Sequence, residues 1–192
     1  MNAIIQILKA SLTMLILAAF VSCGEDKSYI IDGIVYGGVN FEGQQVKLCP
    51  LQGATAENTD STTIHNGKFR FEGVVDRDEL CIIHVPPMLR VFIMREPIFI
   101  REPGHIRITL GERNVIKGTP LNDSLQVWYD YRLELDSIQK SIHQQMKHVD
   151  ALGQVKFLDE IEKLKSEREN RIRETSLRNN NLFGDYIDKF ER

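Results

Sequence analysis

The chain has 192 residues, of which 27% are charged, and a formal net charge of -3 at pH 7. That length fits one ordinary domain, or a small domain with an appendage, and the mixed charges lack the one-sided positive field that nucleic-acid binding requires. We therefore expect no nucleic-acid partner. Beyond the N-terminus no stretch is apolar enough to cross a bilayer, so we expect the body of the protein to be soluble.

The N-terminal segment, residues 1–22, is predicted to be an export signal. One positive charge, Lys9, precedes an uncharged run at 10–21 that is short for a transmembrane helix but typical of a signal peptide. Phe-Val-Ser-Cys at 20–23 resembles the lipobox of bacterial lipoproteins, in which the thiol takes a diacylglycerol. Cys23 would then be the lipid attachment site and residues 23–28 a tether. The alternatives are an ordinary signal peptide cut nearby or an uncleaved anchor.

An acylated Cys23 predicts a protein anchored in the cell envelope, at the outer membrane, with the membrane as its first partner. Glu25 and Asp26 form an acidic pair that resembles the export tags of surface lipoproteins in Bacteroidota-type bacteria. Lys27 interrupts the acidic run, so the periplasmic face and the surface face both stay open.

Two further cysteines, Cys49 and Cys81, would reach an oxidising compartment if the chain is exported. Each lies in an apolar, strand-like run. A disulfide between them is one hypothesis, and two free buried thiols are the other, because the sequence does not show which strands are neighbours.

Residues 29–118 have the pattern of antiparallel strands, with apolar side chains at every second position and turn residues between the runs. In DSTTIHNGKFRFEG, Asn66-Gly67 suits a two-residue type I′ turn, and Phe69 and Phe71 share one face of the following strand. This stretch predicts a β-hairpin with one apolar face.

A second hairpin is predicted in IFIREPGHIRITL, where Pro103-Gly104 suits the centre of a type II turn. The alternation after this turn places Ile106 and Ile108 on one face and Arg107 on the other. Further strands are expected in YIIDGIVYG, QQVKLCP, ELCIIHV, RVFIM and NVIKG. Eight or nine short strands at this spacing predict a β-sandwich-like or barrel-like module.

Residues 119–192 are predicted to be helical. Apolar residues at seven-residue intervals mark one side of a long helix, and Gly153 is expected to break it before a second helix. The two helices would fold back on each other as a hairpin, and LFGDYIDKF would add a short third helix. The stripe consists of Leu121, Trp128, Leu135, Ile142 and Val149. The predicted fold class is therefore mainly β plus α.

The sequence contains no pattern that indicates catalysis, a metal or a cofactor. GxSxG, HExxH and CxxC are absent, and the five histidines are scattered. We therefore name no catalytic residue, no metal ligand and no cofactor, although a site assembled from distant residues would escape this test. Glu102 and the aromatic pair Trp128 and Tyr129 are the features to watch for binding, with packing favoured for Trp128.

Three short motifs resemble the O-glycosylation signal of Bacteroidota-type envelope proteins. They are Asp-Ser-Thr, Asp-Ser-Leu and Asp-Ser-Ile, and their candidate acceptors are Ser61, Ser124 and Ser137. The alternative for the second motif is a helix cap formed by Asp123 or Ser124.

In order along the chain, IDGIVYG, GQQVKLCP, DSTTIHNGKFRFEGVV, EPIFIREPGHIRITL and VIKGTPLNDSLQVWYDY resemble domain of unknown function 4369 in lipoproteins of Bacteroidota. The resemblance spans about residues 28–190. In that family, a β-rich module and a helical segment commonly precede a thioredoxin-like domain that carries the redox chemistry. Arg101 stands where the family more often has an apolar residue. No catalytic residue is carried over, because the chain has no CxxC.

These observations favour a non-enzymatic envelope lipoprotein that acts as a binding or adaptor module. The resemblance implies an alternative, in which the chain is the accessory N-terminal part of a truncated or split thioredoxin-like thiol-disulfide oxidoreductase. Its protein partner would then be a thioredoxin-fold protein, or else another envelope protein. A third hypothesis is a coiled-coil assembly protein that oligomerises through residues 120–175.

Overall fold

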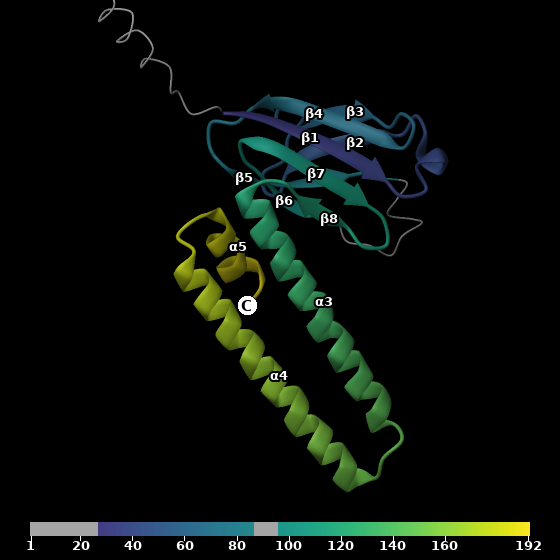
Figure 1. Ribbon diagram of the computed structural model, residues 1–192, viewed down its shortest axis with the longest axis vertical. Helices are drawn as coiled ribbons and strands as arrows, with labels where there is room; N and C mark the ends of the chain where they lie inside the picture. Colours follow the sequence, from purple (N-terminus) through teal and green to yellow (C-terminus); the bar gives the residue numbers. More distant parts are fainter. Residues whose placement is uncertain (1–26, 87–95) are drawn as a thin grey trace, which may run out of the picture.

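The computed structural model describes residues 27–86 and 96–192, which form two four-stranded sheets and three α-helices (Figure 1). The signal peptide, Cys23 and the strand expected in RVFIM lie outside the described residues. The strands are β1 (Ser28–Val35), β2 (Gln45–Pro50), β3 (Asp60–Thr63), β4 (Lys68–Val74), β5 (Glu79–His84), β6 (Ile98–Arg101), β7 (Gly104–Leu110) and β8 (Val115–Lys117). The helices are η1 (Gly38–Phe41), a 3-10 turn, then α3 (Pro120–Met146), α4 (Ala151–Arg178) and α5 (Leu182–Phe190). The predicted β-rich module followed by helices is confirmed.

The strands form a sandwich of two sheets. Sheet A has the order β4-β1-β7-β8 and sheet B has the order β3-β2-β5-β6. All pairs in sheet B are antiparallel, whereas β1 and β7 in sheet A run parallel. The expectation of a purely antiparallel module is therefore wrong at this one pair. Alternation alone does not distinguish the two pairings, because both place every second side chain on the same face.

The Asn66-Gly67 turn forms as predicted, but it does not join two paired strands. Asn66 has a φ of 52° and Gly67 a φ of 70°, as a type I′ turn requires. Beyond the single bridge between His65 and Lys68, however, the chain parts: β3 pairs with β2 in sheet B and β4 pairs with β1 in sheet A. The predicted hairpin is thus a corner between the two sheets.

The second predicted hairpin is also a corner. β6 lies in sheet B and β7 in sheet A, and Pro103 and Gly104 carry the chain from one to the other. Gly104 has a φ of 116°, a left-handed value that explains a glycine here. In each corner the apolar face of the strand still points inward, because the inner faces of the two sheets pack against each other.

The core between the sheets contains the predicted alternating side chains, among them Phe69, Phe71, Ile106 and Ile108, all buried. Arg101 also points to this inner face. The residue before it, Ile100, packs on the other side of sheet B against the helices, and successive strand residues alternate between the two faces. The Arg101 guanidinium contacts the Glu79 carboxylate and lies 5.6 Å from the centre of the Tyr29 ring. An ion pair and an aromatic ring therefore accommodate the arginine at an otherwise apolar position.

The helices form the predicted hairpin, with two differences in detail. The turn lies at residues 147–150, and Gly153 is inside α4, where its N–H donates to the side chain of the N-cap Asp150 at 2.9 Å. Val149 lies in the turn, so the heptad stripe ends at Ile142. Asp150 caps the start of α4, so the break between the helices lies before Gly153 and not at it.

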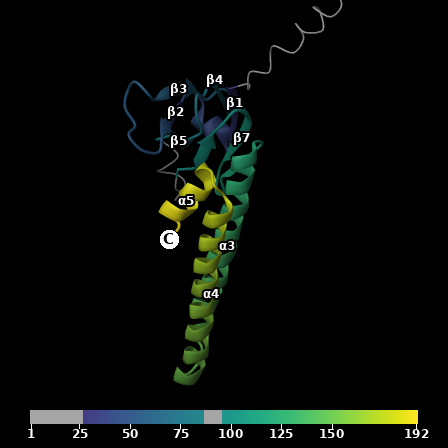
Figure 2. The ribbon, with the colours of Figure 1, turned by 90° about the vertical axis from the view of Figure 1, so that its left-hand side faces the viewer.

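The helical hairpin extends away from the sandwich as a long arm, while the short α5 lies back against the body (Figure 2). Phe183, Tyr186 and Ile187 of α5 pack with Leu125 and Trp128 of α3 in a second apolar cluster, which also includes side chains of β5 and β6. The predicted packing role of Trp128 is confirmed. None of the helices among the described residues is long and apolar enough to span a membrane.

Candidate functional site

Helix α3 closes one side of the sandwich through two buried amide side chains. Asn122 accepts a hydrogen bond from the Ile100 N–H at 2.9 Å and donates to the Ile100 carbonyl at 2.6 Å. One turn later, the Gln126 side-chain oxygen accepts from the Ile116 N–H at 2.7 Å. Ile100 is in β6 and Ile116 in β8, the edge strands of different sheets. The two amides therefore satisfy backbone groups that an open sheet edge would leave unpaired.

Glu102 fixes the start of this helix. Its carboxylate accepts from the backbone N–H groups of Leu121 at 2.9 Å and Asn122 at 3.1 Å, which are free donors in the first turn. Burial raises the pKa of Glu102, against the lowering effect of these hydrogen bonds. The Glu102 side chain is thus committed to the fold, although the sequence marked it as a candidate for binding.

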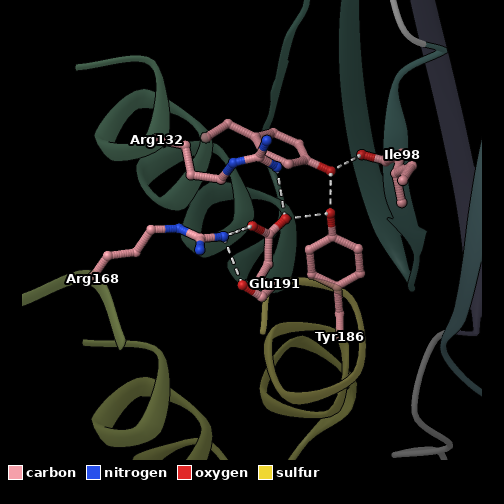
Figure 3. Close-up of polar contacts among 6 residues, drawn as sticks. Ile98, Arg132, Arg168, Tyr186 and Glu191 are labelled. Carbon is pink, nitrogen blue, oxygen red and sulfur yellow. Dashed lines mark hydrogen bonds and ion pairs between the residues drawn. The ribbon is translucent and has the colours of Figure 1, made fainter. Parts of the chain in front are cut away.

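A second polar network joins α3, α4 and the C-terminal residues (Figure 3). The buried Glu191 carboxylate accepts from Arg132 of α3 at 2.7 Å and from Tyr186 of α5 at 3.1 Å, and it lies 3.6 Å from Arg168 of α4. The Tyr129 hydroxyl lies 3.3 Å from that of Tyr186, and burial raises the pKa values of both phenols. This network locks the arm against the body, because each helix contributes at least one partner and the Tyr129 hydroxyl donates to the Ile98 carbonyl of β6 at 3.1 Å.

The two described cysteines are free thiols, and the candidate disulfide is not formed. In the pairing of β2 with β5, Cys49 lies opposite Ile82 and Cys81 lies opposite Pro50. The two thiols therefore point to opposite faces of sheet B, because neighbouring strand positions alternate. Cys81 is in the core, where burial raises its thiol pKa to about 12, whereas Cys49 is half-buried on the other face.

The three candidate glycosylation acceptors differ in their surroundings. Ser61 is exposed in β3, an edge strand, and Ser137 is exposed on α3. Ser124 is half-buried and its hydroxyl donates to the Pro120 carbonyl at 2.9 Å within α3. The alternative helix cap for the second motif is wrong: Thr119 is the N-cap of α3, and Asp123 lies inside the helix and accepts from the Gly118 N–H at 2.8 Å. Glycosylation itself stays a prediction.

His84 and Glu96 form a half-buried contact on the outer face of sheet B. The cross-strand neighbour of His84 is Lys47, so no hydroxyl or thiol stands at that position to act as a nucleophile. We interpret this contact as a hydrogen bond within the fold. Among the described residues, no three His, Cys, Asp or Glu side chains are grouped so as to hold a metal ion.

The outer face of sheet A carries a row of charged side chains across all four strands. Arg70, Asp32, Arg107 and Lys117 lie directly opposite one another in register, from β4 through β1 and β7 to β8. Both Asp32 oxygens are occupied, one by Arg70 at 3.1 Å and the other by His105 at 2.7 Å. We call this set of four residues the charged row.

Arg107 and Lys117 end the charged row as two directly opposed cations. Among the described residues, no carboxylate lies within ion-pair distance of either, while the Asp130 carboxylate near Lys117 is bonded to Arg113 at 2.6 Å. Like charges that face each other across two strands destabilise a sheet. An anionic group bound between them would relieve this repulsion, so the charged row has the chemistry of a binding surface for carboxylate, phosphate or sulfate groups.

Sequence reasoning missed this surface, although it assigned Arg107 correctly to the polar face of its strand. The charged row depends on the parallel pairing of β1 with β7, which brings Asp32 beside Arg107 across 75 residues of sequence. No local pattern encodes that register. The only available signal was the polar outer face of each separate strand.

A family model described as domain of unknown function (DUF4369) matches residues 29–125. The match covers half of the chain: it begins at the second residue of β1, includes the other seven described strands and ends at Leu125 in α3, short of residue 190, to which the resemblance was expected to extend. No curated protein and no solved structure matches the chain significantly.

Proposed function

This chain belongs to the DUF4369 family, a domain of unknown function, and we propose, from its lipobox-like residues 20–23 and from the charged row, that it is a membrane-anchored envelope lipoprotein that serves as a non-catalytic binding or adaptor module. Its ligand would carry anionic groups and would bind at the charged row. The observation that carries this proposal is the opposed pair Arg107 and Lys117 on a sheet face that none of the described helices covers (Figure 1).

The buried charged groups support a binding role over a catalytic one. Glu102 holds the start of α3, Glu191 joins the helices, and Arg101 pairs with Glu79. Each is committed to a contact within the fold, whereas a catalytic acid or base must remain free to meet a substrate. The Cys81 thiol is protonated at neutral pH, which argues against thiol chemistry at that residue.

The predicted tether is short, which limits the distance between an anchor at Cys23 and the sandwich. Cys23 precedes Ser28, the first residue of β1, by five residues, which span at most about 18 Å. β1 is a central strand of sheet A and carries Asp32 of the charged row. An acylated Cys23 would therefore hold the binding surface close to the membrane while the helical arm reaches away from the sandwich.

Mass spectrometry of the N-terminal peptide from the protein in its native membrane tests the anchor. We expect the chain to begin at Cys23 with a mass that includes a diacylglycerol. An unmodified N-terminus at another residue would contradict the lipid anchor. The proposed binding at the charged row does not depend on this result.

A further inference from the structure

The far end of the helical arm exposes four apolar side chains. Leu152, Val155 and Leu158 of α4 are 72%, 61% and 55% exposed. Residues three apart are neighbours on a helix, so these three side chains form one ridge. Val149, in the turn at residues 147–150, adds a fourth apolar side chain that is 36% exposed. We call the four residues the apolar tip, because they lie at the end of the arm away from the sandwich (Figure 2).

The arm itself does not cover the apolar tip. Towards the turn, its buried side chains are Leu135 and Ile142 of α3 and Ile161 of α4. Two helices alone bury only one stripe from each, so the other apolar side chains in this part of the arm face the solvent. Apolar residues scattered singly on a surface are ordinary, whereas a group of them marks a contact with a protein or a membrane.

The charged side chains around the apolar tip are mostly basic. With a rise of about 1.5 Å per residue, residues 140–157 lie within about 10 Å of the turn. This segment carries three lysines, Lys140, Lys147 and Lys156, and one carboxylate, Asp150, which is engaged in capping the start of α4. Among the described residues, none of the three lysines forms an ion pair, in contrast to the lysines farther along α4. Their charges are therefore available to an anionic surface.

The next part of the arm has the opposite charge. Residues 133–139 and 158–164, the following two turns of each helix, carry five carboxylates and one lysine. They are Glu134, Asp136, Asp159, Glu160, Glu162 and Lys163. The charge therefore changes sign along the arm, from basic at its end to acidic behind it. An anionic lipid surface would attract the end of the arm and repel the stretch behind it, which limits how deeply the arm enters.

We propose that the apolar tip binds the surface of a membrane that contains anionic lipids. Val149, Leu152 and Val155 would enter the boundary between headgroups and acyl chains, where interfacial helices bury their apolar side chains to a depth of about 5–10 Å. The three lysines would contact the lipid phosphates. This binding depends neither on the lipid anchor at Cys23 nor on the charged row.

The charges favour a lipid surface over a second copy of this chain. Two copies that met end to end would bring their lysines together, and two copies antiparallel about Val155 would oppose Lys147 with Lys163 of the other copy. A protein partner would have to combine apolar and acidic groups at one place, whereas an anionic membrane offers both over its whole area.

Cosedimentation with lipid vesicles tests the proposal. The chain from Lys27 to Arg192 contains both sheets and all three helices, and it lacks the predicted signal and anchor, which would bind vesicles by themselves. It should bind vesicles of phosphatidylglycerol and phosphatidylcholine about 10-fold or more tightly than vesicles of phosphatidylcholine alone, because each lysine near an anionic surface contributes a factor of about five. Added salt should weaken the binding.

Matched variants locate the contact on the chain. Leu152→Glu combined with Val155→Glu should lower the affinity for the anionic vesicles about 10-fold or more, because the apolar contact is lost and charge is added. Leu177→Glu, 80% exposed near the other end of α4, should leave the affinity unchanged. Arg107→Ala combined with Lys117→Ala should also leave it unchanged, which separates the apolar tip from the charged row.

Three outcomes of the vesicle experiment would overturn the proposal. They are equal affinity for the two kinds of vesicle, an equal loss in the Leu177 variant and the tip variant, and a loss in the variant of the charged row only.

Photo-cross-linking of the full chain in its native membrane is the second measurement. A photoreactive residue at Leu152 should form adducts with phospholipid, which are recognised by their mass. The same photoreactive residue at Leu133, exposed in the acidic stretch of α3, is the control and should form few. Adducts at Leu152 with a protein and not with lipid would overturn the proposal in favour of a protein partner.

Discussion

Asn122 and Gln126 lie one turn apart on α3 and hydrogen bond to edge strands of two different sheets. Asn122 supplies both a donor and an acceptor to Ile100, as a neighbouring strand would. Gln126 supplies only an acceptor, to the N–H of Ile116, and its own amide donates to Asp130. The helix therefore completes the sandwich by covering one edge of each sheet.

Asn122→Ala should lower the free energy of unfolding by about 2–4 kcal/mol, because it leaves the N–H and the carbonyl of Ile100 buried without partners. Chemical denaturation monitored by circular dichroism measures this change. Ser124→Ala, two residues away with one hydrogen bond inside the helix, should change it by less than about 1 kcal/mol. Equal losses in the two variants would contradict a special role of Asn122 at the sheet edge.

Glu102 should give the stability a recognisable pH dependence. Burial raises its pKa above the ordinary value of 4.5, so its contribution is greatest when the carboxyl is protonated. That contribution is fully present below pH 4.5 and is lost as the pH rises through the raised folded pKa. Compared with Glu102→Gln, the native chain should therefore lose stability as the pH rises above about 4.5. If the native chain instead becomes more stable than Glu102→Gln as the pH rises, hydrogen bonding to the Glu102 carboxylate outweighs the effect of its burial, and the prediction is wrong.

Much of the fold follows from local sequence pattern, whereas the wrong predictions all concern which strands pair with each other. Alternation placed Phe69, Ile106 and their neighbours in the core, and the seven-residue spacing located the helical stripe as far as Ile142. The Asn66-Gly67 turn was also correct, whereas the chain bends at Pro103 and Gly104 already belongs to β7; at both places the adjoining strands pair with distant partners. Register and sheet membership depend on contacts far apart in sequence, and the charged row exists only through them.

Glu191 is expected to hold the arm in place. Glu191→Ala should cost about 2–3 kcal/mol of stability, since it leaves Arg132 and Arg168 without their shared carboxylate, although both guanidinium groups are partly exposed. Hydrogen exchange should show faster opening of α5. Glu174→Ala removes an exposed pair with Arg178 and should change stability by less than about 1 kcal/mol. A loss no larger than this at Glu191 would mean that apolar packing alone fixes α5.

The two described thiols should react at very different rates. A thiol reagent should modify the half-buried Cys49 in the native chain and reach Cys81 only when the protein unfolds, because the Cys81 thiol is buried and has a pKa of about 12. Mass spectrometry of the labelled peptides locates each modification. Recovery of a peptide pair joined by a Cys49–Cys81 disulfide would contradict the register of β2 and β5.

Photo-cross-linking in the native membrane tests the proposed binding surface most directly. A photoreactive residue at Ile34, half-exposed on the outer face of sheet A, should capture a partner with anionic groups. The capture should weaken with added salt and disappear when Arg107 and Lys117 are both replaced by alanine. The same photoreactive residue at Leu133 of the arm is the control. Capture at Ile34 that is unchanged by the double replacement, or no capture beyond the level at Leu133, would contradict the account.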